Sequence, residues 1–370
     1  MFLYLYILAG LAVAAIFHFQ GVQNQQWYLL TVATLLAAGL YSSTYGISIK
    51  EARRHVGLIL RAVTIGVLFK ALLIGGIMTA VLQNPFGFVL GIIVAQIDPL
   101  STAGLMKGSR LSKKAKSILA AWSSFDDPVT VIMSLYVPIL VALLLGTHWQ
   151  PIRGTMQEAG LFGYLAETGI NLLFAGGIFI LWRLMKRHSR ASNYLVVGLV
   201  ALGMYGLFIG SLSIAVYYFW MLGIALLGLF MRPPIEAAVT FTVRWALSIA
   251  AVLLGILLIN GVNILPGMAL GVAAFVAQVV VGLLLTGKLP KKDRWHIALA
   301  QQNGITAIIL ALLFETYYPG TIAIVGPAII VTNTTHRLAN MVLDMHLAHS
   351  FEQITPKYQL GKLRAHMRKI

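Results

Sequence analysis

The stretch "SSFDDPVTVIMSLYVP", residues 123–138, places two adjacent carboxylates, Asp126 and Asp127, inside an apolar run. No Lys or Arg lies between Lys116 and Arg153, so the neighbouring sequence offers neither acid a counter-charge. An Asp at the centre of a transmembrane helix costs about 2.5–3.5 kcal/mol on insertion scales, and such residues usually mark ion paths or proton relays. The meaning of these two acids therefore depends on whether the run lies at membrane depth.

The overall composition is that of an integral membrane protein. The chain has 370 residues, of which 59% are hydrophobic and 10% are charged, and its mean hydropathy is +0.86. It has no Cys, which excludes disulfides and thiolate metal sites. The first residues, "MFLYLYILAGLAVAAIF", lack the basic region and cleavage site of a signal peptide and are predicted to form the first span. We expect one transmembrane domain over 1–346, without an appended sensing module, and a short basic tail over 347–370.

The apolar runs predict an all-α polytopic protein with about twelve transmembrane helices. The uncharged stretch 195–230 would be roughly 54 Å long as one helix, too long for a hydrocarbon core of about 30 Å, so we divide it in two. The reversal is expected at "IGSLS", residues 209–213. The predicted spans are about 3–19, 28–49, 56–82, 86–106, 115–145, 166–185, 194–209, 212–231, 239–259, 264–286, 295–317 and 320–343.

The distribution of positive charge supports this topology. With twelve spans, 24 of the 27 Lys and Arg residues fall on one side, Arg153 lies on the other, and Arg61 and Lys70 lie within the third span. By the positive-inside rule both termini are cytoplasmic. The formal charge of +16 is thus explained by loops near anionic lipid headgroups, and nucleic acid is not expected as a partner. We expect the protein in the plasma membrane of a bacterium or archaeon.

Two spans are interrupted by polar residues at corresponding places. In "VAQIDPLSTAG", residues 94–104, the residue before Pro disfavours helical geometry, so the fourth span should unwind at Asp98. In "LAQQNGITAII", residues 299–309, polar residues and Gly304 break the eleventh span. Two broken helices in matching positions of inverted repeats, here spans 3–5 and 10–12, point to a transporter's midplane site. The polar residues around the breaks include Ser101, Thr102 and Asn303.

The two adjacent acids cannot both face the same direction, because neighbouring residues lie about 100° apart on a helix. One can face a cavity while the other faces a partner helix. Thr130 lies three positions after Asp127 on roughly the same face and could extend a polar track. We expect Asp98, Asp126 and Asp127 to handle a cation or proton.

The motif "IDPLSTAGL", followed about thirty residues later by "SSFDDPVTV", resembles the monovalent cation/proton antiporter superfamily. The resemblance covers the whole membrane domain, and it implies that Asp127 alternately binds a proton and Na⁺ or K⁺. Asp126 would be an auxiliary carboxylate, and Asp98 would neutralise the positive N-terminal ends of the crossed half-helices. It also implies a moving core (about 56–145 and 264–343) and a scaffold (about 3–49 and 194–259) that forms a homodimer in the lipid. No cofactor is expected.

The chain departs from the pattern of this superfamily at several positions. Ile97 replaces a Thr in the broken-helix motif, and Trp122 replaces a Glu that some members carry. Gln278 stands where many members have a basic residue in the tenth span, and Asn303 where relatives often have Arg. These changes leave ion selectivity and stoichiometry open. If the two acids share one cavity without a cation, we expect two protons to move for each cation, making transport electrogenic.

Two further residues carry alternative interpretations. Lys70, near the middle of the third span, is the symmetry mate of Gln278. It could balance the C-terminal dipole ends of the broken helices, or pair with one of the three membrane Asp residues, or it could face outward toward water. His336, near the cytoplasmic end of the last span, could sense pH or could line the inner funnel.

Two other classes of function remain as alternatives. A passive channel or an organic-anion transporter could use the same fold. An intramembrane aspartyl protease also uses two membrane Asp residues, but it needs Tyr-Asp and Gly-x-Gly-Asp contexts, and neither occurs in this chain. The sequence therefore favours a secondary transporter rather than an enzyme.

Overall fold

The structure is a computed structural model that describes residues 2–19, 21–47, 56–99, 102, 106, 111–145, 160–188, 194–301 and 303–367. Within these ranges every regular element is a helix, and no strand occurs. The helices are α1 (Phe2–Phe17), α2 (Gln26–Tyr45), α4 (Val56–Arg61), α5 (Val67–Leu82), α6 (Phe86–Val94), α8 (Lys113–Leu145), α9 (Gly160–His188), α10 (Tyr194–Tyr217), α11 (Met221–Phe230), α12 (Glu236–Leu257), α13 (Ile264–Leu285), α14 (Lys291–Ala298), α15 (Ile305–Tyr317) and α16 (Thr321–Met367).

The helices are those of an integral membrane protein. In the described part of the chain, five are long and apolar enough to cross a bilayer: Thr64–Leu82, Phe162–Arg187, Val197–Tyr217, Glu236–Asn260 and Ile264–Leu285. The helices α6 and α15 are shorter, about 14 and 20 Å at 1.5 Å per residue, because α6 ends and α15 begins at a polar interruption. The count of twelve spans stays a prediction.

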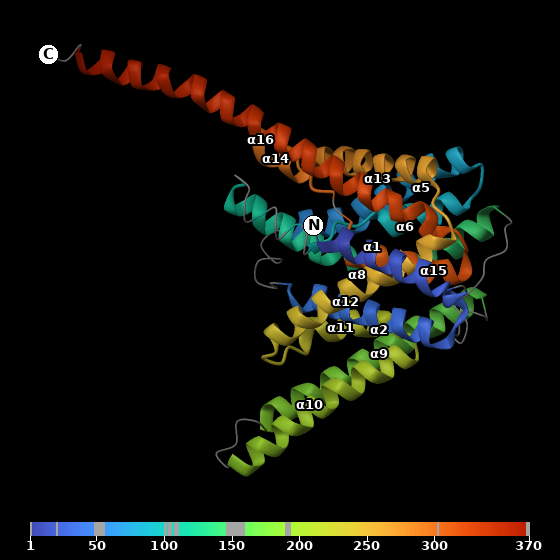
Figure 1. The fold of residues 1–370 in the computed structure, drawn as a ribbon. Helices are drawn as coiled ribbons and strands as arrows, with labels where there is room; N and C mark the ends of the chain where they lie inside the picture. Colours follow the sequence, from blue (N-terminus) through green and yellow to red (C-terminus); the bar gives the residue numbers. More distant parts are fainter. Residues whose placement is uncertain are drawn as a thin grey trace.

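The helices pack in two groups (Figure 1). In one group α5 lies against α6 and α13, and α13 lies against α16. In the other, α1 packs on α12, α2 packs on α11 and α12, and α9 packs on α10 and α11. The helix α2 also contacts α8 and α15, so it forms part of the boundary between the groups. The assignment of these groups to a moving core and a dimer-forming scaffold stays a prediction.

The expected reversal at residues 209–213 is wrong. The helix α10 runs without a break to Tyr217, and the chain turns at residues 218–220 instead. Phe219 has a positive φ of 59°, and the backbone N–H of Trp220 donates to Ala215 O at 2.7 Å. The serines of the "IGSLS" stretch are accommodated within the helix, since Ser211 Oγ donates to Phe208 O at 3.0 Å. The actual turn has no Gly or Pro to signal it.

The last helix, α16, extends through both the predicted twelfth span and the predicted tail. Its 47 residues would span roughly 70 Å, more than twice the thickness of the hydrocarbon core. Its C-terminal half extends beyond the other helices (Figure 1). The basic segment 347–370 therefore continues the span as a helix through Met367, although it has no fold of its own.

The third span, which carries Lys70, packs closely against the first broken helix, α6. A π-helical turn over Ala62–Gly66 precedes α5, and turns of this kind occur often at functional sites. Farther along, α5 and α6 approach so closely that only glycine fits between them. A Cβ on Gly91 would lie 2.6 Å from Ala71 O, and a Cβ on Gly75 would lie 2.9 Å from Phe88 Cα. Small residues allow such close helix contact in membranes.

This contact predicts a difference between two neighbouring glycines. Gly75→Val should destabilise the protein by about 1–3 kcal/mol, because the added methyl groups collide with the backbone of α6. Gly76→Val is the matched control, since a Cβ there meets no atom within 4 Å and the loss of helix flexibility is the same. Thermal unfolding of the two detergent-solubilised variants measures the difference. Equal unfolding temperatures would contradict the close packing of α5 on α6.

Candidate functional site

The two interruptions predicted from the sequence meet in the structure. The helix α6 ends at Val94, and its last carbonyl groups have no helical partner. The side-chain amide of Gln301, from the second interruption, donates to Val94 O and to Gln96 O, both at 3.0 Å. Gln301 is fully buried. A neutral amide therefore satisfies the negative end of this half-helix.

Asp98 lies at the opposite, positive end of a helix. Its backbone carbonyl accepts from Thr102 N at 3.0 Å. Asp98 abuts the start of α15, because a Cβ on Gly304 would lie 2.1 Å from Asp98 Cγ. Helix N-termini carry partial positive charge and are stabilised by a nearby carboxylate. This geometry fits the role expected for Asp98.

Side chains on one face of α16 form hydrogen bonds with the backbone of the second interruption. Asn333 accepts from Asn303 N and donates to Asn303 O, both at 3.0 Å. One turn farther on, His336 Nδ1 lies 2.6 Å from Leu299 O, and Asn340 Nδ2 donates to the same oxygen at 3.0 Å. Because Leu299 O can only accept, His336 acts as the donor. The structure thus gives His336 a supporting contact, and its role as a pH sensor stays a prediction.

Asp126 is fully buried and accepts three hydrogen bonds from the protein. Trp122 Nε1 donates to Asp126 Oδ1 at 3.0 Å, while Lys70 Nζ and Ile97 N both lie 3.1 Å from Asp126 Oδ2. The backbone of Ile97 thus serves this acid without the hydroxyl that Thr would carry. We call this set the Asp126 clamp; it comprises Lys70, Ile97, Trp122 and Asp126.

Lys70 is the cation of the clamp. Its side chain is fully buried and forms an ion pair with Asp126, and its Nζ lies 5.5 Å from the centre of the Trp122 ring. A cation at this distance is attracted to the face of an indole ring. Of the alternatives left open for Lys70, the outward-facing one is therefore wrong, and of the three membrane acids Lys70 pairs with Asp126.

Asp127 has a different environment. Its Oδ2 accepts the hydroxyl of Ser43 at 2.8 Å, and the Thr306 side chain and the Asp98 carboxylate lie close to it. Its other oxygen, Oδ1, has no hydrogen-bond partner within the described residues, although the side chain is fully buried. The same holds for the hydroxyl of Thr130, which is also buried. Asp127 is thus a buried carboxylate with one oxygen available to a ligand.

Two of the remaining predicted residues form hydrogen bonds with other groups. Gln278 donates to Ile297 O at 3.2 Å and so supports α14. Thr102 donates to Ser123 Oγ at 3.1 Å, and Ser101 lies outside the described residues. Ser43 and Thr306 were not identified from the sequence, because isolated hydroxyl residues in apolar helices form no motif.

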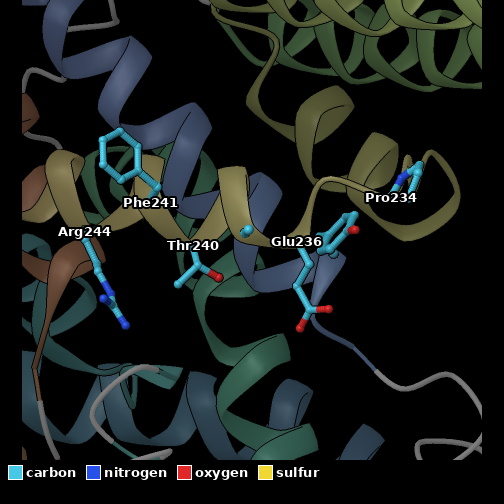
Figure 2. A pocket seen from close by; sticks show the side chains of 7 residues that line it. Pro234, Glu236, Thr240, Phe241 and Arg244 are labelled. Carbon is cyan, nitrogen blue, oxygen red and sulfur yellow. The ribbon is translucent and has the colours of Figure 1, made fainter.

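A pocket of about 810 Å³ opens where α2 ends and α12 begins (Figure 2). Tyr45, two residues after Ser43, lines it. From α12 it is lined by Glu236, Thr240 and Arg244, which repeat every four residues along one face. By the predicted topology this is the cytoplasmic side. The sequence did not predict a pocket here.

No protein-family model matches the chain. The structure of the sodium proton antiporter MjNhaP1 from Methanocaldococcus jannaschii at pH 8 aligns over 92% of both chains, with a TM-score of 0.61 and 19% identity. The chain has the fold of this antiporter. An electron-microscopy structure of MjNhaP1 aligns over 84% of this chain and 80% of its own, with a TM-score of 0.51 and 21% identity. The MjNhaP1-like fold agrees with the resemblance found in the sequence motifs.

In this MjNhaP1-like fold, the buried amide of Gln301 should contribute more to stability than that of Gln278. Gln301→Met leaves the carbonyl ends of α6 without their side-chain donor, at a cost of about 1–3 kcal/mol for a buried acceptor. Gln278→Met removes a single bond and serves as the comparison. Gln301→Glu should be worse still, since a carboxylate would face carbonyl oxygens. Thermal unfolding in detergent gives the order, and a smaller loss for Gln301→Met than for Gln278→Met would contradict it.

Proposed function

We propose that this protein exchanges a monovalent cation, Na⁺ or K⁺, for protons by alternating access, with Asp127 as the carboxylate that binds both. The proposal rests mainly on one observation: Asp127 is fully buried, yet one of its oxygens has no partner among the described residues. A carboxylate in such a position can accept a proton or a cation, but not both at once. Competition for this one group then couples the two fluxes.

The oxygen atoms around Asp127 suit a hard cation, which prefers oxygen ligands. Ser43 and Thr306 bring hydroxyl groups to the carboxylate, from α2 and α15 respectively. Thr130 brings another buried hydroxyl on the same helix as Asp127. The side chain of Asp98 adds negative charge nearby. Together these groups would replace part of the hydration shell of Na⁺ or K⁺.

The placement of these groups supports alternating access. Ser43 belongs to the predicted scaffold, whereas Asp127 and Thr306 belong to the predicted core. A displacement of the core along α2 would break the bond between Ser43 and Asp127 and carry the acid to the other side. The pocket beside Tyr45 and Glu236 would be the cytoplasmic approach to the site.

The alternatives fit these observations less well. An organic anion would meet three membrane carboxylates and, among the described Lys and Arg residues, a single buried cation, Lys70, which is already paired. A passive channel needs a continuous path past the site, whereas Asp126 and Asp127 are both fully buried. A transporter that binds a cation at Asp127 therefore accounts best for the site.

Asp127→Asn should insert and fold, because a neutral amide costs less in the membrane than a carboxylate. It should abolish coupled exchange, since an amide neither titrates nor carries the charge that holds a cation. The measurement is dissipation of a pH gradient by added Na⁺ or K⁺ in proteoliposomes. Glu352→Gln, in the predicted tail, is the matched acid-to-amide control and should exchange normally. Cation-driven proton flux near the wild-type rate in the purified Asp127→Asn variant would refute the role of Asp127.

Ser43→Ala should weaken cation binding without abolishing exchange. The variant loses one hydrogen bond to the Asp127 carboxylate, worth about 1.5–3 kcal/mol when the acid is ionised, which corresponds to roughly a tenfold to hundredfold higher KM for the cation. Thr34→Ala, at a more exposed site on the same helix, is the control. The cation dependence of the initial proton flux gives the KM. An unchanged KM would mean that Ser43 does not contribute to the cation site.

A further inference from the structure

The two adjacent carboxylates have opposite hydrogen-bonding environments. In the Asp126 clamp both oxygens of Asp126 are engaged: Oδ1 by the indole N–H of Trp122, and Oδ2 by Lys70 and the backbone of Ile97. Each of these partners is a donor. Three donors on one carboxylate favour its ionised form, because each donor is attracted more strongly to the negative charge than to a protonated acid.

Lys70 has no alternative partner. Within the described residues its ammonium group donates only to Asp126, and neither side chain is exposed. If Asp126 took up a proton during the cycle, Lys70 would remain as an unpaired buried cation. Breaking one partner of a buried pair in this way is strongly unfavourable. The net charge of the pair therefore stays at zero when the neighbouring acid changes its ligand.

The surrounding packing keeps Lys70 in place. The π-helical turn at Ala62–Gly66 lies just before Lys70 in the sequence, and the close glycine contact between α5 and α6 fixes the third span against the first broken helix. Trp122 lies one helical turn before Asp126, so that it can donate to the acid while its ring lies near the ammonium group. The clamp therefore joins the third span, the first interruption and α8.

We propose that Lys70 is a positioning residue that holds Asp126 as a permanent anion, so that Asp127 alone exchanges ligands and one proton moves for each cation. This inference rests on the proposed function of Asp127. It replaces the expectation of two protons per cation, which assumed that no cation faced the pair of acids. In the cation-loaded and proton-loaded states the site then carries the same net charge, and exchange is electroneutral.

The stoichiometry can be measured as a balance point. Wild-type proteoliposomes are prepared with a fixed Na⁺ gradient, and the opposing pH gradient is varied until net proton flux stops. One-for-one exchange predicts that the two gradients are equal in size at balance, and that a voltage imposed with valinomycin and K⁺ does not move it. A K⁺ gradient without valinomycin controls for K⁺ as a substrate. A balance point that shifts with voltage, or that needs a smaller pH gradient, would overturn the inference.

Variants test the role of the clamp separately. Lys70→Gln alone should lower the unfolding temperature, because Asp126 is left buried without its cation. Lys70→Gln combined with Asp126→Asn should recover part of that loss and should keep the wild-type balance point, although its rate falls. Arg61→Gln, an exposed cation on the same span, is the control for charge removal. A double variant with a different stoichiometry, or a Lys70→Gln protein as stable as wild type, would refute the clamp.

The two proposals fail in different ways. If Asp127→Asn still exchanges Na⁺ for protons, the assignment of the carrier is wrong. If Asp127→Asn is inactive but the wild-type balance point depends on voltage, the carrier stands and the permanent ionisation of Asp126 does not.

Discussion

Where a helix ends at membrane depth, its last backbone carbonyl groups cannot accept hydrogen bonds from water. The protein itself must therefore supply the donors. Two helices of this chain stop in that way, and the remainder of the site follows from how their ends are satisfied. Gln301 donates to the carbonyl end of α6, and Asp98 lies against the start of α15. Each interruption thus supplies the group that the other one needs. The two broken segments must therefore meet. The polar groups through which they face each other line the site.

The same constraint separates the two acids of the DD pair. They are adjacent in sequence and about 100° apart on α8, so one faces the first interruption and the other faces α2 and α15. The acid that meets the interruption, Asp126, finds a backbone donor, an indole N–H and an ammonium group. The acid that meets α2, Asp127, finds one hydroxyl bond and otherwise only near neighbours. A difference of one residue in helix register therefore gives the two acids different sets of hydrogen-bond partners.

The sequence indicated the candidate acids of the site but not the full set of contacts that they make. Asp98, Asp126 and Asp127 could be identified because a carboxylate in an apolar run is costly, and because a following Pro marks a weak point in a helix. Their partners could be identified only in part, since Lys70 was a candidate for any of the three acids and Ser43 was not a candidate at all. Lys70 lies 56 residues from Asp126 and Ser43 lies 84 residues from Asp127, so both contacts depend on tertiary packing. The fold class followed from hydropathy, but the turn at Phe219 did not, since it uses a positive φ at a residue that gives no local signal.

The position of Lys70 has a further physical consequence. In the related proteins that the sequence motifs resemble, a basic residue on the tenth span is expected to serve the buried acid. In this chain Gln278 stands at that position of the tenth span and donates to Ile297 O. The cation comes from the third span, where Lys70 pairs with Asp126. Lys70 donates to Asp126. The carbonyl end of α6 accepts instead from the amide of Gln301, which adds no charge. The charge of Asp126 is therefore balanced from the third span, while a neutral amide satisfies the end of the broken helix.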